Sequence, residues 1–162
     1  MYAHSACTRS VSRLILPPCC VYPTVNAVET TGRAVIANRT PERAEALAAA
    51  FADLGVTQGV SFAYVGDTPF DLIINATSAS LSGEIPPIPP GAIGPQTVCY
   101  DLAYGRSAMG FVRWAQQAGC ALAVQGLGML VEQAAESFRL WRGVRPETKQ
   151  VLAVLKARVG SI

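Results

Sequence analysis

From Ala34 onward the sequence predicts an α/β protein built on a doubly wound parallel sheet. Short apolar runs alternate with segments of helical periodicity, an order typical of parallel sheets that are covered by helices. The run FDLIINAT, residues 70–77, is almost continuously apolar, as expected for a strand that is covered on both faces. Polar residues cluster directly after several of these runs, at the edge of such a sheet where ligands bind.

The first predicted strand and helix lie between residues 34 and 55. The run AVIA, residues 34–37, predicts a short buried strand. Thr40 is a favourable N-cap, and Pro41 occupies the preferred first helical position. Gly55 is a suitable C-terminal stop for this helix. Its apolar face consists of Ala44, Leu47, Ala48 and Phe51.

The remaining elements follow in alternation. Beyond FDLIINAT, the runs TVCYDLAY (residues 97–104) and ALAV (residues 121–124) predict two more strands. Helical patterns cover residues 109–119, 126–141 and 147–158. The stretch 81–95 contains five prolines and three glycines, so we expect a surface connection there.

The composition fits one globular domain and excludes several classes of function. The chain has 162 residues, of which 51% are hydrophobic and 15% are charged, and its formal net charge is +2. So small a charge gives no reason to expect nucleic acid or an anionic membrane surface as a partner. No apolar run is long enough to span a bilayer. The five cysteines form neither a C-x-x-C pair nor a metal-ligand spacing with His4, so we expect a cytoplasmic protein with reduced thiols and no metal.

Residues 1–33 differ from the rest of the chain. They hold three of the five cysteines and three arginines but only one acid, Glu29, and their hydrophobic pattern fits neither a helix nor a strand. Pro17 ends any helix that begins before it. We expect an atypical, poorly ordered leader: either a transit peptide or, as we favour, a segment without structural meaning, such as an out-of-frame or mis-joined translation.

Three of the predicted strands end in polar clusters. These clusters are Asn38-Arg39-Thr40, Asn75-Ala76-Thr77-Ser78, and Tyr100-Asp101 with Tyr104. Any one of them is compatible with an ordinary turn, because Asn, Thr and Ser are common turn residues. Since the carboxyl ends of parallel strands share one edge of the sheet, three clusters together favour a ligand site.

The cluster after the first of these strands indicates which ligand is expected. In NAD-binding proteins an acid at this place accepts hydrogen bonds from the ribose 2′-hydroxyl. Arg39, with the Thr40 hydroxyl and the Asn38 amide, supplies positive charge and donors instead, which suit the 2′-phosphate of NADP. Arg43 lies one helical turn farther along, at a helix N-terminus that favours anions. From these residues alone, a solvated turn with a helix cap is an equally acceptable interpretation.

Several motifs together resemble the C-terminal, NADP-binding half of shikimate dehydrogenase. They occur in the family's order as NRTPERA (residues 38–44), DLIINATSAS (71–80), YDLAY (100–104) and GLGMLVEQAAESFRLWRGVRP (126–146). The resemblance implies a Rossmann-like fold and an enzyme that reduces 3-dehydroshikimate to shikimate with NADPH, in aromatic amino acid biosynthesis. It divides the chain into the leader (1–33), a partial NADP-binding domain (34–125) and a helical segment (126–162) that packs at the interdomain cleft in the family.

The resemblance also assigns roles to individual residues. The tyrosine hydroxyl of Tyr104 would contact the substrate carboxylate, and Gln133 would reach the substrate from the helix after Gly126. Leu102 and Gly126 would lie near the nicotinamide. The 2′-phosphate would be held by Asn38, Arg39, Thr40 and Arg43, and the cofactor would be lined at the second strand end by Ala76, Thr77 and Ser78.

The sequence departs from the family in its first third. The Gly-rich loop of a dinucleotide-binding fold lies roughly twenty residues before the Asn-Arg-Thr turn, where this chain reads LILPPCCVYP without a glycine. We therefore expect a sheet that is incomplete at its first strand and Gly-rich loop, with AVIA left as an unpaired edge. The catalytic Lys-Asp pair belongs to the family's N-terminal domain. Lys149 and Lys156 match no catalytic motif, so no catalytic residue is assigned.

These departures leave several functions open. We expect a fragment that binds NADP weakly at best and that is inactive alone, so whether this chain is an enzyme stays undecided. It would act on shikimate or 3-dehydroshikimate only when an N-terminal half completes it. The alternatives are a non-catalytic NADP-binding or interaction module, one half of a split enzyme, and the cofactor half of another NADP-dependent reductase such as a quinate-type relative.

Overall fold

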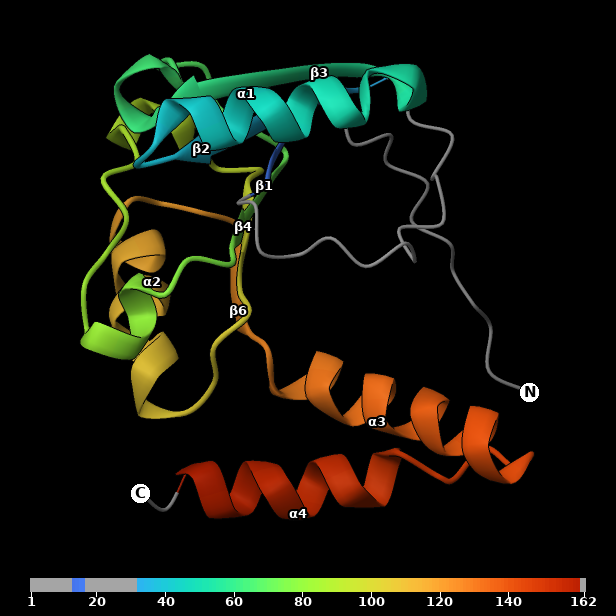
Figure 1. Ribbon diagram of the computed structural model, residues 1–162. Coiled ribbons are helices and arrows are strands. Elements are labelled where there is room, and N and C mark those ends of the chain that lie inside the picture. Colours follow the sequence, from blue (N-terminus) through green and yellow to red (C-terminus); the bar gives the residue numbers. More distant parts are fainter. Residues whose placement is uncertain (1–12, 17–31, 161–162) are drawn as a thin grey trace.

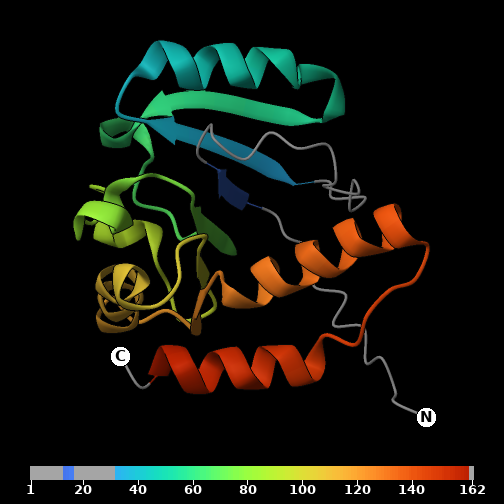
Figure 2. The same ribbon diagram turned by 60° about the horizontal axis from the view of Figure 1, so that its bottom comes forward.

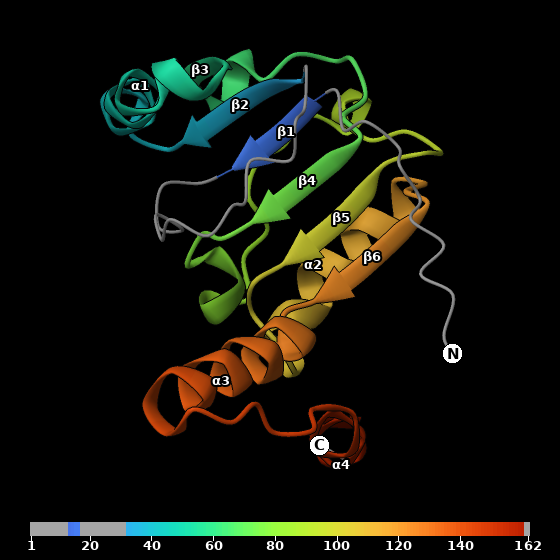
Figure 3. The ribbon, with the colours of Figure 1, turned by 90° about the vertical axis from the view of Figure 1, so that its right-hand side faces the viewer.

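The computed structural model describes residues 13–16 and 32–160, in which the strands form one parallel sheet of order β3-β2-β1-β4-β5-β6. Figure 3 shows β2, β1, β4, β5 and β6 side by side, with their arrowheads at the same end of the sheet. This order is that of a doubly wound sheet, as the sequence predicts. The strands are β1 (Arg13–Leu16), β2 (Arg33–Asn38), β3 (Val56–Ser61), β4 (Leu72–Asn75), β5 (Val98–Asp101) and β6 (Leu122–Gln125).

Helices lie between β2 and β3 and between β5 and β6, and others follow β6 (Figure 1). Helix α1 follows β2 and packs on β2 and β3, whereas α2 follows β5 and packs on β5 and β6. The α-helices in the part of the chain that the structure describes are α1 (Pro41–Ala50), α2 (Arg106–Gln117), α3 (Leu127–Arg142) and α4 (Lys149–Gly160). Four 3-10 helices also occur in the described residues: η1 (Ala52–Leu54), η2 (Phe62–Tyr64), η3 (Ala79–Ser82) and η4 (Pro90–Ala92).

The two faces of the sheet are buried by different helices, because neighbouring residues of a strand point to opposite sides. On β2, Val35 belongs to a large apolar cluster that includes Phe111 and Ala115 of α2. The next residue, Ile36, packs instead with Ala44 and Ala48 of α1. Helices α1 and α2 therefore cover opposite faces, and in Figure 3 α2 lies behind β5 and β6.

The Pro-rich connection between β4 and β5 contributes to the core. The expectation of a purely surface segment is wrong, because Ile88, Ala92 and Ile93 are buried in the same cluster as Phe111 and Cys99. The prolines restrict the backbone and leave few amides that need partners, so this irregular segment buries apolar side chains without a regular element.

The expectation of a missing central strand is also wrong. Residues 13–16 form β1, which pairs in parallel with β2 on one side and with β4 on the other. The run AVIA therefore lies inside the sheet rather than at an unpaired edge. The short apolar run LIL before Pro17 supplies this strand, although it is too short for its period to be recognised. The rest of the glycine-free stretch, beyond Leu16, lies outside the described residues, as does most of the proposed leader.

Two smaller expectations about the first strand and helix need correction. Helix α1 ends at Ala50, and Gly55 closes the 3-10 turn η1 instead of the helix. Thr40 stands at the N-cap, as predicted, but its side chain makes no capping hydrogen bond. The Asn38 side chain turns the chain there, because its Oδ1 accepts a hydrogen bond from the Thr40 amide at 3.0 Å.

The last two helices extend beyond the carboxyl edge of the sheet. Helix α3 begins directly after β6, and α4 returns beside it (Figure 2). Near the end of α3 large apolar side chains are exposed to solvent, and Trp141 is 80% exposed. None of the helices in the described part of the chain is long and apolar enough to cross a membrane.

Candidate functional site

A cleft of about 1120 Å³ lies at the carboxyl ends of β2 and β4. One wall is formed by the turn after β2 and by α1, and the other by the segment that follows β4. This is the edge of a doubly wound sheet where ligands bind. Parts of two of the three predicted strand-end clusters line the cleft, and the predicted site residues in its lining are Asn38, Arg39, Arg43, Ala76, Thr77 and Ser78.

The α1 side of the cleft carries the positive charge. Arg39 and Arg43 are exposed, and within the described residues neither guanidinium forms an ion pair. The Arg43 amide donates to the Thr40 carbonyl at 3.1 Å, which starts the helix with its N-terminus at the cleft. Two unpaired guanidinium groups beside a helix N-terminus are well suited to hold a phosphate.

The β4 side of the cleft is organised by Asn75. Its Oδ1 accepts hydrogen bonds from the Thr77 amide at 3.1 Å and from the Thr77 hydroxyl at 2.8 Å. The Thr77 hydroxyl in turn accepts a bond from the Ala79 amide at 3.2 Å. The side chain of Thr77 is thus used to shape its own loop, which fixes the backbone of residues 76–79 against the cleft.

Behind this loop lies a buried polar network of Asn75, Ser80 and Asp101. Asp101 is 0% exposed, and its Oδ2 accepts hydrogen bonds from Ser80 Oγ at 2.6 Å and Asn75 Nδ2 at 3.1 Å. Asn75 Nδ2 also donates to Ser80 Oγ at 2.9 Å. The other carboxylate oxygen, Oδ1, accepts a bond from the Ala103 amide at 2.8 Å. Every polar atom of these side chains is satisfied, which a buried carboxylate requires.

The ends of β5 and β6 meet at Leu102 and Gly126. The Gly126 amide donates to the Ala103 carbonyl at 2.8 Å, and Gln125 Oε1 accepts a bond from the Gly105 amide at 2.7 Å. A Cβ on residue 126 would lie 2.2 Å from the Leu102 carbonyl oxygen, so only glycine permits this approach. Both residues of the predicted nicotinamide end are therefore in direct contact, although neither lines the cleft.

The two predicted substrate-binding residues lie apart from the cleft. Tyr104 follows β5 and is 46% exposed, and Gln133 is exposed on α3. Thr40 also lies outside the cleft lining.

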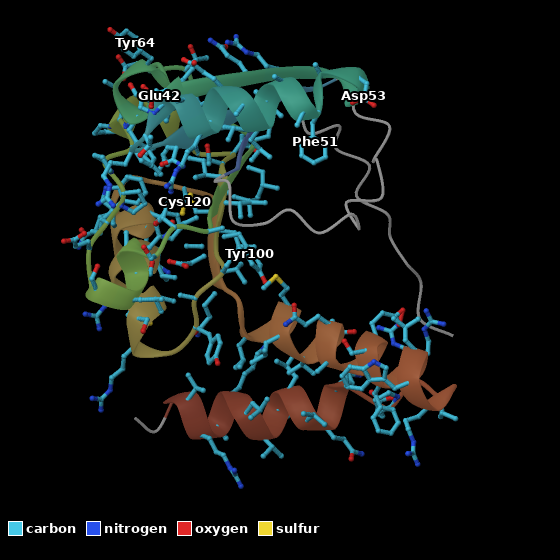
Figure 4. All side chains as sticks on the ribbon, in the orientation of Figure 1. Glu42, Phe51, Asp53, Tyr64, Tyr100 and Cys120 are labelled. Atoms are coloured by element: carbon cyan, nitrogen blue, oxygen red, sulfur yellow. The ribbon has the colours of Figure 1, made fainter. Side chains whose placement is uncertain are left out.

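Tyr100, from the third strand-end cluster, extends from β5 on the side away from Cys120 (Figure 4). Burial raises the pKa of its hydroxyl, and a backbone hydrogen bond with Met129 partly offsets this rise.

Several residues that line the cleft are not among the predicted site residues. Ala46, Leu47 and Ala50 continue the face of α1 on which Arg43 lies, at spacings of three and four, and this periodicity was available as a signal. Phe62 was not recognisable because it follows β3, a strand whose sequence VTQGVS is too polar to stand out. The segment after β4 adds Leu81, Ser82, Glu84, Ile85, Pro86 and Pro87.

The buried thiol of Cys99 gives the chain a testable dependence on pH. Burial, with the neighbouring Cys120 thiol as a smaller cause, raises the pKa of Cys99 from 9.0 to about 12. The unfolded chain loses this proton at lower pH than the folded chain, so the free energy of unfolding falls as pH rises from 9 toward 12. We expect the fall between pH 8 and pH 10, measured by urea denaturation, to be steeper for the native chain than for Cys99→Ala. Equal slopes would contradict this assignment.

Comparison with known proteins gives this geometry a context. Residues 126–156 match the family model of the shikimate 5′-dehydrogenase C-terminal domain. The shikimate dehydrogenase (NADP(+)) of Alkalilimnicola ehrlichii is 56% identical to this chain over 128 residues, which are 79% of this chain and 47% of that protein. The chain belongs to the shikimate dehydrogenase family. It spans about half the length of the curated relatives that it matches, and this half is their C-terminal part.

Solved structures of the shikimate dehydrogenase family and its neighbours share the fold. An Ael1 enzyme from Pseudomonas putida superposes with a TM-score of 0.74 at 34% identity. The match covers 91% of this chain and 55% of the chain of that enzyme. Shikimate 5-dehydrogenase from Thermus thermophilus in complex with shikimate has a TM-score of 0.59 at 31% identity, over 80% of this chain and 46% of its own. The prediction of a Rossmann-like doubly wound sheet is confirmed, whereas the individual site residues stay predictions.

Proposed function

We propose that this chain is the NADP-binding part of an enzyme that reduces 3-dehydroshikimate to shikimate. The observation that carries this proposal is the cleft that joins Asn38, Arg39 and Arg43 to the loop after β4. The family supports it, because relatives such as that of Alkalilimnicola ehrlichii are named shikimate dehydrogenase (NADP(+)). When bound, NADPH supplies the hydride for the reduction.

The residues of the α1 side fit the adenosine 2′-phosphate. The planar guanidinium of Arg39 can donate two hydrogen bonds to one phosphate, and Arg43 adds a second positive charge from the same helix end. Asn38 holds the turn through its bond to the Thr40 amide, which keeps Arg39 beside the cleft. No carboxylate follows β2 directly, and Glu42 in the first turn of α1 is not in the cleft lining, whose acid, Glu84, belongs to the segment after β4.

The residues beyond the cleft would serve the reacting end of the site. In this proposal Leu102 and Gly126 contact the nicotinamide, and their close approach fixes the surface on which it rests. The Tyr104 hydroxyl and the Gln133 amide would donate to the substrate. None of them is a group that exchanges a proton readily near neutral pH, so proton transfer would be left to the rest of the enzyme.

Cofactor preference tests this proposal on the chain itself. We expect isothermal titration calorimetry of the 162-residue chain to show NADP binding at least about tenfold tighter than NAD, because only NADP presents a phosphate to Arg39 and Arg43. Adenosine 2′-monophosphate is expected to bind and to compete with NADP. A chain that is folded by circular dichroism but binds NAD as tightly as NADP, or neither, would overturn the proposal.

A further inference from the structure

We propose that the buried network of Asn75, Ser80 and Asp101 is a positioning device that joins the two ends of the cofactor site. It holds the loop after β4, which lines the cleft, in a fixed relation to the loop after β5, which leads to Leu102 and Gly126. This inference rests on the proposed function, since it assigns these two loops to opposite ends of one bound NADP.

The first step is that Asn75 connects the network to the cleft. Its side chain lies at the end of β4 and is buried, so both Oδ1 and Nδ2 need hydrogen-bond partners within the protein. The two atoms have different partners. Oδ1 takes both bonds from Thr77, which is in the cleft lining, while Nδ2 donates inward to Ser80 and Asp101. Rotation of the Asn75 amide would therefore break the hydrogen bonds that shape the loop after β4 and those of the buried network at the same time.

The second step is that Asp101 connects the network to the other loop. Asp101 lies directly opposite Asn75 in the parallel pairing of β4 and β5. Its Oδ1 holds the Ala103 amide, and the Ala103 carbonyl accepts the Gly126 amide at 2.8 Å. A continuous series of hydrogen bonds thus runs from Thr77 at the cleft, through two buried side chains, to the start of α3.

The third step is that the residue types fit only one arrangement of donors and acceptors. The carboxylate of Asp101 accepts all three of its hydrogen bonds, and Ser80 donates to it while accepting from Asn75. Asp101→Asn would turn an amide nitrogen toward other donors, and Asn75→Asp would place two carboxylates together. The exchange of both residues restores a complementary set, because each donor then faces an acceptor again.

The test compares a long ligand with a short one. Adenosine 2′-monophosphate occupies only the cleft between α1 and the loop after β4, whereas NADP also reaches the loop after β5. For Asp101→Asn and Asn75→Asp we expect NADP affinity to fall about tenfold or more, and affinity for adenosine 2′-monophosphate to fall clearly less, because only NADP depends on the relation between the two loops. The double exchange Asn75→Asp with Asp101→Asn should recover most of the loss. Ser137→Ala, which removes an exposed hydroxyl bonded to a backbone carbonyl on α3, serves as the control.

Several results would overturn the positioning role. Equal weakening of both ligands would mean that the network only stabilises the fold, and unchanged NADP affinity would mean that it has no role in binding. Should the single exchanges fail to fold, Ser80→Ala supplies the milder variant, with the same expectation for the two ligands.

A second measurement separates this inference from the proposed function. Hydrogen exchange of the Thr77 and Ala103 amides is measured on the unliganded chain, and both amides should exchange faster in each single variant than in the native chain. If the native chain binds no NADP, the proposed function fails, and exchange alone still decides whether the network orders both loops. Unchanged exchange at these amides would overturn the network's role whatever the ligand result.

Discussion

Arg39→Ala is expected to weaken NADP binding by about 10- to 100-fold while changing NAD binding by less than about twofold. The guanidinium lies in the cleft lining and has no ion pair in the described part of the chain, so a phosphate competes with no other acid for it. NAD has a hydroxyl where NADP has the phosphate and therefore loses little. Calorimetric titration of the two nucleotides with the same protein sample measures this difference directly.

Two further variants show whether the effect comes from the shape of the side chain or from charge alone. Arg39→Lys keeps the charge but not the planar pair of donors, so we expect an intermediate loss. Arg113→Ala removes an exposed arginine of α2 that does not line the cleft, and should leave both affinities unchanged. A parallel decrease for NADP and NAD in Arg39→Ala would show that the residue supports the fold of the turn and does not bind the 2′-phosphate.

The second large effect concerns the contact between β3 and α1. Gly59→Ala is expected to lower the free energy of unfolding by about 3 kcal/mol or more, as the new methyl group overpacks a rigid contact. Its Cβ would lie 2.3 Å from the Glu45 amide nitrogen and 2.4 Å from the Ala44 carbonyl carbon and oxygen. These are backbone atoms of a helix and cannot move alone, so α1 would have to shift away from the sheet. Urea denaturation followed by circular dichroism gives the change.

Gly128→Ala is the matched control for this substitution. Gly128 lies in the first turn of α3, and no heavy atom of another part of the described chain lies within 4 Å of its would-be Cβ. Alanine is the better helix former, so we expect this variant to be unchanged or more stable by up to about 1 kcal/mol. Equal denaturation midpoints for Gly59→Ala and the native chain would mean that α1 does not pack so closely on β3.

The elements that were predicted well are those whose hydrophobic pattern indicates which side chains are buried. The continuous apolar run of β4 and the amphipathic patterns of α2 and α3 are each long enough, or apolar enough, to identify. The strand β3 was missed because it is an edge strand with a polar sequence, and β1 because four residues show no period. Such segments become strands only because they pair with neighbouring strands. These partners are distant in the sequence, so the segment alone does not identify them.

The candidate site, too, was predictable from the sequence only in part. Strand-end clusters were visible as residue types, and two of them, including Arg39 and Thr77, do share one cleft. Which clusters meet depends on the order of the strands: β4 lies beside β5, so the third cluster joins the second through Asn75 and Asp101 rather than through the cleft. Ser80 carries no signal of its own, because its importance arises only from the turn η3 that places it in the network.

The central place of β1 has a consequence for the order of folding. This strand precedes every other element of the sheet in the chain, yet its two neighbours are β2 and the much later β4. The pair β2 and β3, with α1 between them, can form without β1, and so can the group of β4, β5, α2 and β6. Because non-local pairings form slowly, the insertion of β1 between these two preformed halves is expected to be the rate-limiting event, and until then each half presents an open edge to other molecules.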